Sequence, residues 1–196
     1  MSKKEQYKFF AFLNRMKLIN RWSLMHNRTL ENVAQHSHQT AVLAHALGLI
    51  DKRVFNKTTD PDKCAVIALY HEVAEVLTGD APTPVKYRSP DMIAAYKQAE
   101  KCAQERVLGE LPAELKPFFT QALQPEPCRE TELVRFADKI AAYIKCVEEV
   151  SAGNTEFLNA KKTTETAIQN FKDETVHYFM KRFAEAFSMN LDELME

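Results

Sequence analysis

The most informative segment of the chain is Cys64-Ala65-Val66-Ile67-Ala68-Leu69-Tyr70-His71-Glu72-Val73-Ala74-Glu75-Val76-Leu77-Thr78-Gly79-Asp80. Its first seven residues are apolar on every side, which is typical of a helix buried in a protein core. Asp60-Pro61-Asp62 supplies a helix start, with Pro at the first helical position and acids on the positive end of the dipole, and Gly79 supplies the stop. We therefore expect one central helix between these signals.

Three ionisable residues close that helix. His71 and Glu75 are four residues apart and would share a face, with Glu72 about 100° round the axis. Ionisable groups are rarely buried unless they are paired or bound to a metal, because desolvating a charge is costly. A buried helix that ends in an imidazole and two carboxylates indicates a reaction centre.

Composition excludes several classes of protein. The 196 residues are 45% hydrophobic and 27% charged with a net charge of −1, which fits a single globular domain over 1–196 and not a general nucleic-acid binder. Only four glycines are present, so no Gly-rich phosphate loop exists. No segment reaches the roughly 18 apolar residues of a membrane span, and the N-terminus leads into no signal-peptide run. Four scattered cysteines without a Cys-x-x-Cys indicate reduced thiols in the cytoplasm.

The rest of the chain predicts an all-α fold. Asn32 followed by Gln35 is typical of a helix start, whereas Pro82 and Pro84 exclude a helix over 80–87. No segment shows a convincing strand pattern. The remaining expected helices cover 5–19, 33–55, 90–108, 112–123, 131–151, 155–171 and 173–187, with a loop at 20–28.

Four residues from three separate helices are candidate metal ligands: His36, His71, Glu72 and Asp138. Two imidazoles and two carboxylates suit a catalytic divalent ion with open positions for water and substrate, whereas structural zinc sites more often use thiolates. Taken singly, His36 could be a hydrogen-bonded core histidine and Asp138 could pair with a neighbouring base. Sequence spacing does not show that the three helices converge, so both interpretations stay open at this point.

The order His36, His71 with a following acid, then Asp138 resembles the H…HD…D pattern of the HD-domain metal phosphohydrolases. Further segments are similar to the bacterial 5′-deoxynucleotidases of that superfamily, and the similarity covers nearly the whole chain. Those segments are Leu18-Ile19-Asn20-Arg21-Trp22, Glu31-Asn32-Val33, Glu75-Val76-Leu77-Thr78-Gly79-Asp80, Pro82-Thr83-Pro84-Val85-Lys86-Tyr87 and Ala141-Ala142-Tyr143.

This resemblance implies an HD-domain helical bundle that hydrolyses deoxyribonucleoside 5′-monophosphates with a Co²⁺- or Mn²⁺-type ion. It also implies a cytoplasmic homodimer, with no nucleic-acid polymer and no membrane as partner. Matched by motif position, the four candidate ligands hold the metal, Arg21 orients the phosphate, Trp22 lines the sugar site and Glu75 handles protons. The residues expected to contact the nucleotide are Arg21, Trp22, His36, Glu72, Asp80, Ala81, Pro82, Thr83 and Asp138.

One position departs from the family pattern, because Glu72 stands where the signature has Asp. The extra methylene moves the carboxylate by about 1.5 Å, and a misplacement of about 1 Å can cost a hundredfold in rate. Glu is itself a common metal ligand, so we expect metal binding to survive, with the preferred ion and the rate left open.

Two other functions remain as alternatives. The first is an HD-like nucleotide sensor that has lost turnover through this change. The second is a zinc hydrolase using His71-Glu72, although Glu75 stands where the H-E-x-x-H motif needs its second His.

Overall fold

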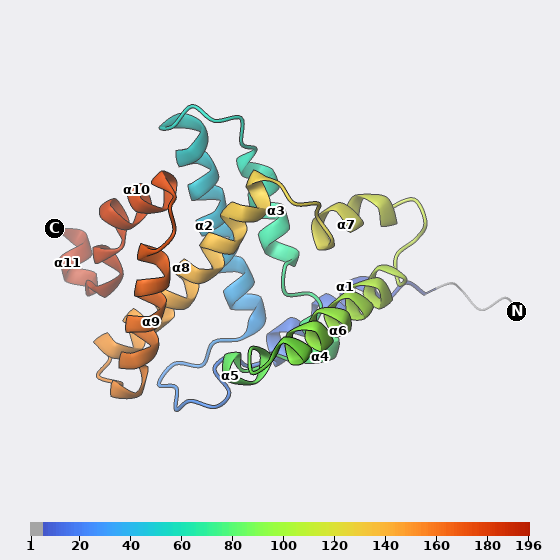
Figure 1. The fold of residues 1–196 in the computed structure, drawn as a ribbon, viewed down its shortest axis with the longest axis horizontal. Helices are drawn as coiled ribbons and strands as arrows, with labels where there is room; N and C mark the ends of the chain where they lie inside the picture. Colours follow the sequence, from blue (N-terminus) through green and yellow to red (C-terminus); the bar gives the residue numbers. More distant parts are fainter. Residues whose placement is uncertain (1–5) are drawn as a thin grey trace, which may run out of the picture. The chain divides into compact units, whose positions relative to one another are not determined.

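The computed structural model describes residues 6–196, which form two compact units (Figure 1). The first unit contains residues 6–24, Glu31–Ser37 and Tyr70–Glu126, and the second contains Met25–Leu30, His38–Leu69 and Pro127–Glu196. Over residues 6–196 the regular structure is helical, apart from one isolated bridge between Asn20 and Asn32. The all-α prediction is confirmed. Within the same range, no helix is long and apolar enough to cross a membrane.

The first unit is built around α6 (Pro90–Leu108), the longest helix that lies wholly within it. This helix packs against α1 (Phe9–Leu13), α4 (Glu75–Thr78), α5 (Thr83–Lys86) and α7 (Lys116–Leu123). The first turn of α2 (Val33–Arg53) also belongs to this unit. The buried apolar core here comprises Phe9, Met16, Val33, Val73, Val107, Leu108, Leu111, Ala122 and Leu123.

The second unit is built around α8 (Arg129–Ser151), whose apolar stripe is buried along most of its length. Its other helices are the rest of α2, most of α3 (Pro61–Tyr70), α9 (Leu158–Gln169), α10 (Glu174–Phe183) and α11 (Leu191–Met195). Short 3₁₀ turns lie at Thr155–Phe157 and Glu185–Ser188 in this unit. A third 3₁₀ turn, at Met16–Leu18, belongs to the first unit. The core residues contributed by α8 include Leu133, Phe136, Ala137, Ile140, Ala141, Ile144 and Val147.

The helix start predicted at Asn32 is confirmed, and α6 begins at the predicted residue, Pro90. Asn32 and Gln35 bond reciprocally at the start of α2, with the Asn32 N–H donating to Gln35 Oε1 at 2.9 Å and the Gln35 N–H donating to Asn32 Oδ1 at 3.0 Å. The Ser89 hydroxyl accepts from the Met92 N–H and caps α6. These caps need only neighbouring residues, which is why the sequence predicts them.

The prediction of a single central helix between residue 61 and Gly79 is wrong. The chain is helical in α3 and again in α4, but residues 71–74 form a turn between them. The turn uses the tighter i→i+3 pattern, with the Val73 N–H bonded to the Tyr70 carbonyl at 3.1 Å and the Glu75 N–H to the Glu72 carbonyl at 3.0 Å. Burial of Val73 in the first core accompanies the break. The apolar segment Cys64–Tyr70 is also not buried on every side, since Val66 is 45% exposed and Leu69 is 42% exposed.

Three smaller expectations also need correction. Residues 83–86 form α5, because Pro84 falls in the first helical turn, where a missing N–H costs nothing. The N-terminal helix shrinks to α1 because the chain turns at Asn14 and continues as a 3₁₀ turn at Met16–Leu18, and residue 5 lies outside the described range. The sequence also missed α11, whose Asn190 and Glu193 form a capping box. The expected single domain is not tested and stays a prediction.

Candidate metal centre and substrate site

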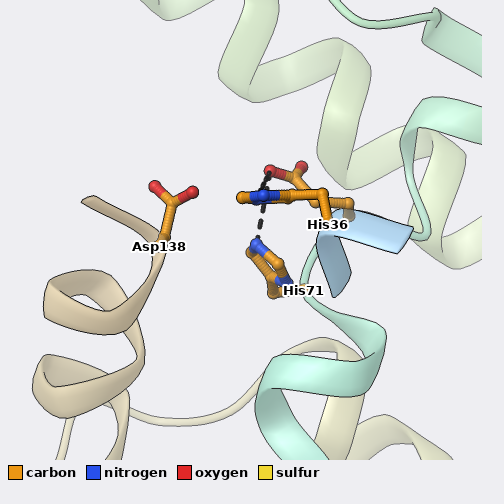
Figure 2. Close-up of side chains that lie close together, drawn as sticks. His36, His71 and Asp138 are labelled. Carbon is orange, nitrogen blue, oxygen red and sulfur yellow. Dashed lines mark ion pairs between the residues drawn. The ribbon is translucent and has the colours of Figure 1, made fainter. Parts of the chain in front are cut away.

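The first unit brings three of the four predicted ligands together. His36 comes from the first turn of α2, where its side chain is fully buried, while His71 and Glu72 come from the turn that interrupts the central helix. Glu72 Oε1 lies 3.4 Å from His71 Nε2 and 4.0 Å from His36 Nε2. Each residue offers one ligand atom, and the three atoms lie within 4.8 Å of one another. Figure 2 shows the imidazoles of His36 and His71, with dashed lines for ion pairs.

The fourth predicted ligand, Asp138, belongs to the second unit. It lies midway along α8 and is partly buried beside the apolar stripe, as expected from the sequence. Its carboxylate is labelled in Figure 2.

Two further acids face the same cluster. Burial, together with the charges of Glu72 and Asp80, raises the pKa of Glu75 to about 9, against an opposing effect of Arg21. Burial also raises the pKa of Asp80, although Arg21 and a hydrogen bond from the Trp22 backbone oppose that rise. The Glu75 Oε2 atom is buried and accepts no hydrogen bond from the described residues. Acids crowded in this way are typical of a functional site.

Arg21 and Trp22 lie in the predicted loop before α2, and both side chains reach Glu31. Glu31 Oε2 accepts from Arg21 Nε and from Trp22 Nε1, each at 3.1 Å. Arg21 Nη1 lies 3.8 Å from Glu72 Oε1, so the guanidinium spans the distance from Glu31 to a candidate ligand. Trp22 has a φ of 58°, in the left-handed region that bulky residues rarely adopt, at a cost of about 1–3 kcal/mol.

The loop after α4 begins at Gly79, whose φ of 73° favours glycine. The chain then runs through Asp80, Ala81 and Pro82, all partly buried, to Thr83, which is exposed at the start of α5. Asp80 thus lies among the acids of the first unit, and its contact with a nucleotide stays a prediction. Contacts of Ala81, Pro82 and Thr83 with a nucleotide stay predictions.

The residues present fit a divalent ion. Two imidazole nitrogens and a carboxylate oxygen form a mixed donor set of the kind that catalytic transition-metal and zinc sites use. The buried Glu75 Oε2 has no donor among the described residues, and a cation nearby would offset the repulsion between Glu72, Glu75 and Asp80. The chemistry of the donor set and its acidic surroundings both favour a metal.

The sequence prediction missed one residue of this site. Glu31 appeared there only as part of a motif, without a role, yet it bonds both Arg21 and Trp22. The single signal was a carboxylate directly before the Asn32 helix start. Nothing in that spacing indicates which side chains it meets.

Comparison with known proteins identifies relatives along almost the whole chain. A family model described as "5′-deoxynucleotidase YfbR-like" matches residues 8–187. A 5′-deoxynucleotidase of Enterobacter sp. (strain 638) is 46% identical over 193 residues, 97% of each chain. One of Vibrio parahaemolyticus is 46% identical over 188 residues, covering 95% of this chain and 97% of the relative.

Solved structures share the fold at lower identity. An HD-domain phosphohydrolase from Listeria innocua superposes with a TM-score of 0.81 at 21% identity, over 96% of this chain and 92% of that one. The HD phosphohydrolase of cyanophage S-2L, described as bound to dA and one catalytic Zn²⁺ ion, gives 0.60 at 18% identity, over 95% and 97% of the two chains. The family match and the full-length relatives together show that this chain belongs to the YfbR-like 5′-deoxynucleotidase family, within an HD-domain phosphohydrolase fold.

Proposed function

We propose that His36, His71, Glu72 and Asp138 hold one divalent ion of the Co²⁺ or Mn²⁺ type. With it, the chain removes the 5′-phosphate from deoxyribonucleoside 5′-monophosphates, the activity for which its full-length relatives are named. The observation that carries the proposal is the convergence of His36, His71 and Glu72 in the first unit.

The assignment of Asp138 as the fourth ligand rests on the ligand count and on its place in the family pattern. Two imidazoles and one carboxylate leave a divalent ion with one unbalanced positive charge and few protein ligands. Asp138 offers a carboxylate oxygen from a well-supported helix, which would balance that charge. The cyanophage enzyme with this fold is described with one catalytic Zn²⁺ ion, so zinc stands beside cobalt and manganese as a candidate.

When bound, a divalent ion supplies Lewis-acid chemistry that activates water for attack on phosphorus at neutral pH. The Arg21 guanidinium presents a planar fork of donors, which matches the oxygens of a phosphate group and orients it. Glu75 lies four residues after His71 and is partly buried among acids, so its carboxyl group is placed to pass a proton to the departing 5′-oxygen. The product pair is then the deoxynucleoside and inorganic phosphate.

Sugar recognition is assigned to Trp22 and to the loop from Asp80 to Thr83. The indole offers a flat apolar surface beside the phosphate-orienting Arg21, and Pro82 limits the conformations of the facing loop. A ribose 2′-hydroxyl enclosed there without a partner would cost about 1–3 kcal/mol. We therefore expect deoxyribose to be preferred. The dA described in the cyanophage enzyme supports the same class of ligand.

A homodimer in the cytoplasm completes the proposal, supported by the family resemblance alone. Sedimentation of the purified chain tests the dimer. The alternative of a zinc hydrolase using His71-Glu72 loses support, because residues 71–74 form a turn and His71 and Glu75 do not share one continuous helix. The sensor alternative keeps one argument, the Glu72 in place of the family Asp.

The deciding experiment measures phosphate release from a panel of deoxyribo- and ribonucleoside 5′-monophosphates, with Co²⁺, Mn²⁺, Zn²⁺ and Mg²⁺ supplied separately. We expect release from the deoxynucleotides, no release from chelator-treated protein, and none from His71→Ala at the same metal concentration. A protein that binds metal and dAMP but releases no phosphate with any ion would support the sensor and refute the enzyme.

A further inference from the structure

Glu31 directly precedes Asn32, the cap of α2, and is hydrogen-bonded to the loop that carries Arg21 and Trp22. Its Oε2 atom accepts hydrogen bonds from Arg21 Nε and Trp22 Nε1, both at 3.1 Å. Its main-chain carbonyl accepts from the Arg21 N–H at 2.9 Å. One residue therefore fixes the backbone of Arg21 and the side chains of both Arg21 and Trp22.

The bond to Arg21 sets the plane of the guanidinium. Because the group is planar, engaging its Nε edge fixes the direction in which the terminal nitrogens point. Arg21 Nη1 accordingly lies 3.8 Å from Oε1 of the ligand Glu72. The side chains of Arg21 and Glu31 are only 12% and 11% exposed, so this charge-assisted bond is weakly screened by water.

The hydrogen bond from Trp22 Nε1 to Glu31 fixes the orientation of the indole ring. The residue adopts a φ of 58°, which a bulky side chain keeps only when its surroundings impose it. The Trp22 ring is held through its N–H by Glu31, while its backbone N–H donates to the Asp80 carboxylate. Trp22 is thus tethered at both its side chain and its backbone.

We infer that Glu31 is a positioning residue, whose one carboxylate orients both the guanidinium that receives the phosphate and the indole that lines the sugar site. The inference rests on the proposed roles of Arg21 and Trp22. It makes phosphate binding and sugar discrimination depend on one residue that is assigned no contact with the nucleotide or the metal.

The test compares the unmodified protein with Glu31→Gln and Glu31→Asp, with Glu110→Gln as the matched control. Glu110 is also in the first unit, pairs with Arg106 and has a side chain 12% exposed. Steady-state kcat and KM are measured on dAMP and AMP, at a temperature where every variant is folded. Glu31→Gln keeps the shape and offers its amide oxygen as acceptor to Arg21 and Trp22, but it loses the charge that strengthens both hydrogen bonds.

We expect Glu31→Gln to lower kcat/KM on dAMP about tenfold, the difference between a hydrogen bond to a charged acceptor and one to a neutral acceptor. The ratio of kcat/KM on dAMP to that on AMP should fall in the same variant. Glu31→Asp keeps the charge, so its kcat/KM on dAMP and its dAMP-to-AMP ratio should lie between those of Glu31→Gln and those of the unmodified protein. Trp22→Phe removes the indole N–H that donates to Glu31. In a Trp22→Phe protein, adding Glu31→Gln should therefore cause no further change in the ratio of kcat/KM on dAMP to that on AMP.

A second readout needs no turnover. Trp22 is the single tryptophan of the chain, so indole fluorescence reports its surroundings alone. We expect its emission maximum to shift in Glu31→Gln and not in Glu110→Gln. Failure of the unmodified protein to release phosphate would refute the proposed function while leaving this readout to test Glu31. Unchanged emission and an unchanged dAMP-to-AMP ratio in Glu31→Gln, or equal changes in Glu110→Gln, would overturn the inference.

Discussion

Asp51 in the second unit and Glu75 in the first show how differently two carboxylates can be placed within one chain. Asp51 is fully buried and accepts hydrogen bonds from Arg129, Thr59, Thr175 and Lys57. Burial alone would raise its pKa, but these bonds, led by Arg129, outweigh that effect and hold the pKa well below its usual range.

Glu75 shows the reverse arrangement. Its nearest charges include Glu72 and Asp80, one of its oxygens accepts no bond from the described residues, and its pKa rises to about 9. A structural carboxylate is surrounded by donors, whereas this one is surrounded by acids. Crowding Glu72, Glu75 and Asp80 together therefore costs stability, which is expected where function requires such a cluster.

The sharpest test of this contrast is Glu75→Ala. We expect turnover of dAMP to fall by roughly 10² to 10⁴, because a general acid is lost, while metal binding stays. The free energy of unfolding should stay level or rise, since one of three crowded acids is gone. Steady-state kinetics and urea unfolding of the same preparation measure both, with exposed Glu114→Ala as the control. Turnover equal to that of the unmodified protein would remove Glu75 from the mechanism.

Arg129→Met should give the opposite profile. Arg129 bonds Asp51 twice and also pairs with Asp173, so its loss leaves a buried carboxylate poorly compensated. We expect unfolding to become easier by about 3–5 kcal/mol, with unchanged kcat on the protein that is folded. Arg135→Met, at an exposed position on the same helix, is the control. A loss of stability no larger than that of the control would contradict the structural role.

Acid titration of stability extends the comparison to Glu149. Burial raises its pKa, but bonds from Lys145, Asn154 and the N–H groups of Arg28 and Thr29 outweigh this and lower the pKa to about 2. A pKa lowered on folding stabilises the protein above the unfolded value of about 4.5 and loses that contribution as the pH falls toward 2.

We therefore expect Glu149→Gln to unfold more easily at pH 7, on the order of 3 kcal/mol. The difference in free energy of unfolding between Glu149→Gln and the unmodified protein should become smaller as the pH falls below about 4.5. Chemical unfolding at a series of pH values measures it. A gap that is constant from pH 7 to pH 3 would show that the ionised carboxylate contributes nothing.

The smallest expected effect concerns the preference for deoxyribose over ribose. Trp22→Ala should relax the preference for dAMP over AMP by about ten- to a hundredfold, more than it lowers the rate on dAMP. Relative kcat/KM on the two nucleotides measures it. Equal rates on both nucleotides in the unmodified protein would remove the deoxy preference and leave a general nucleotidase.

The parts of the fold that were predictable depend on neighbours in sequence. The Asn32–Gln35 cap lies within four neighbouring residues, and the long helices α2, α6 and α8 carry sustained periodicity. The break at residues 71–74 was not predictable, because burial of Val73 depends on a core assembled from distant segments. The α5 helix was missed because Pro84 was treated as a breaker instead of a first-turn residue.

The candidate site follows the same division. Residue type and order predict His36, His71 and Glu72 as ligands, and the first unit brings their side chains together. Glu31 was not identified, because its bonds to Arg21 and Trp22 cross an irregular loop in which Trp22 takes a positive φ without a glycine to signal it. Side-chain contacts across irregular backbone have no period for a sequence to display.

Titration of chelator-treated protein with Co²⁺ tests whether His36, His71, Glu72 and Asp138 hold one divalent ion. Visible absorption of the bound ion reports both stoichiometry and ligand environment. We predict one Co²⁺ per chain in the unmodified protein, and no such band at equal metal concentration in His71→Ala. An unchanged band and unchanged affinity in folded His71→Ala would contradict the account.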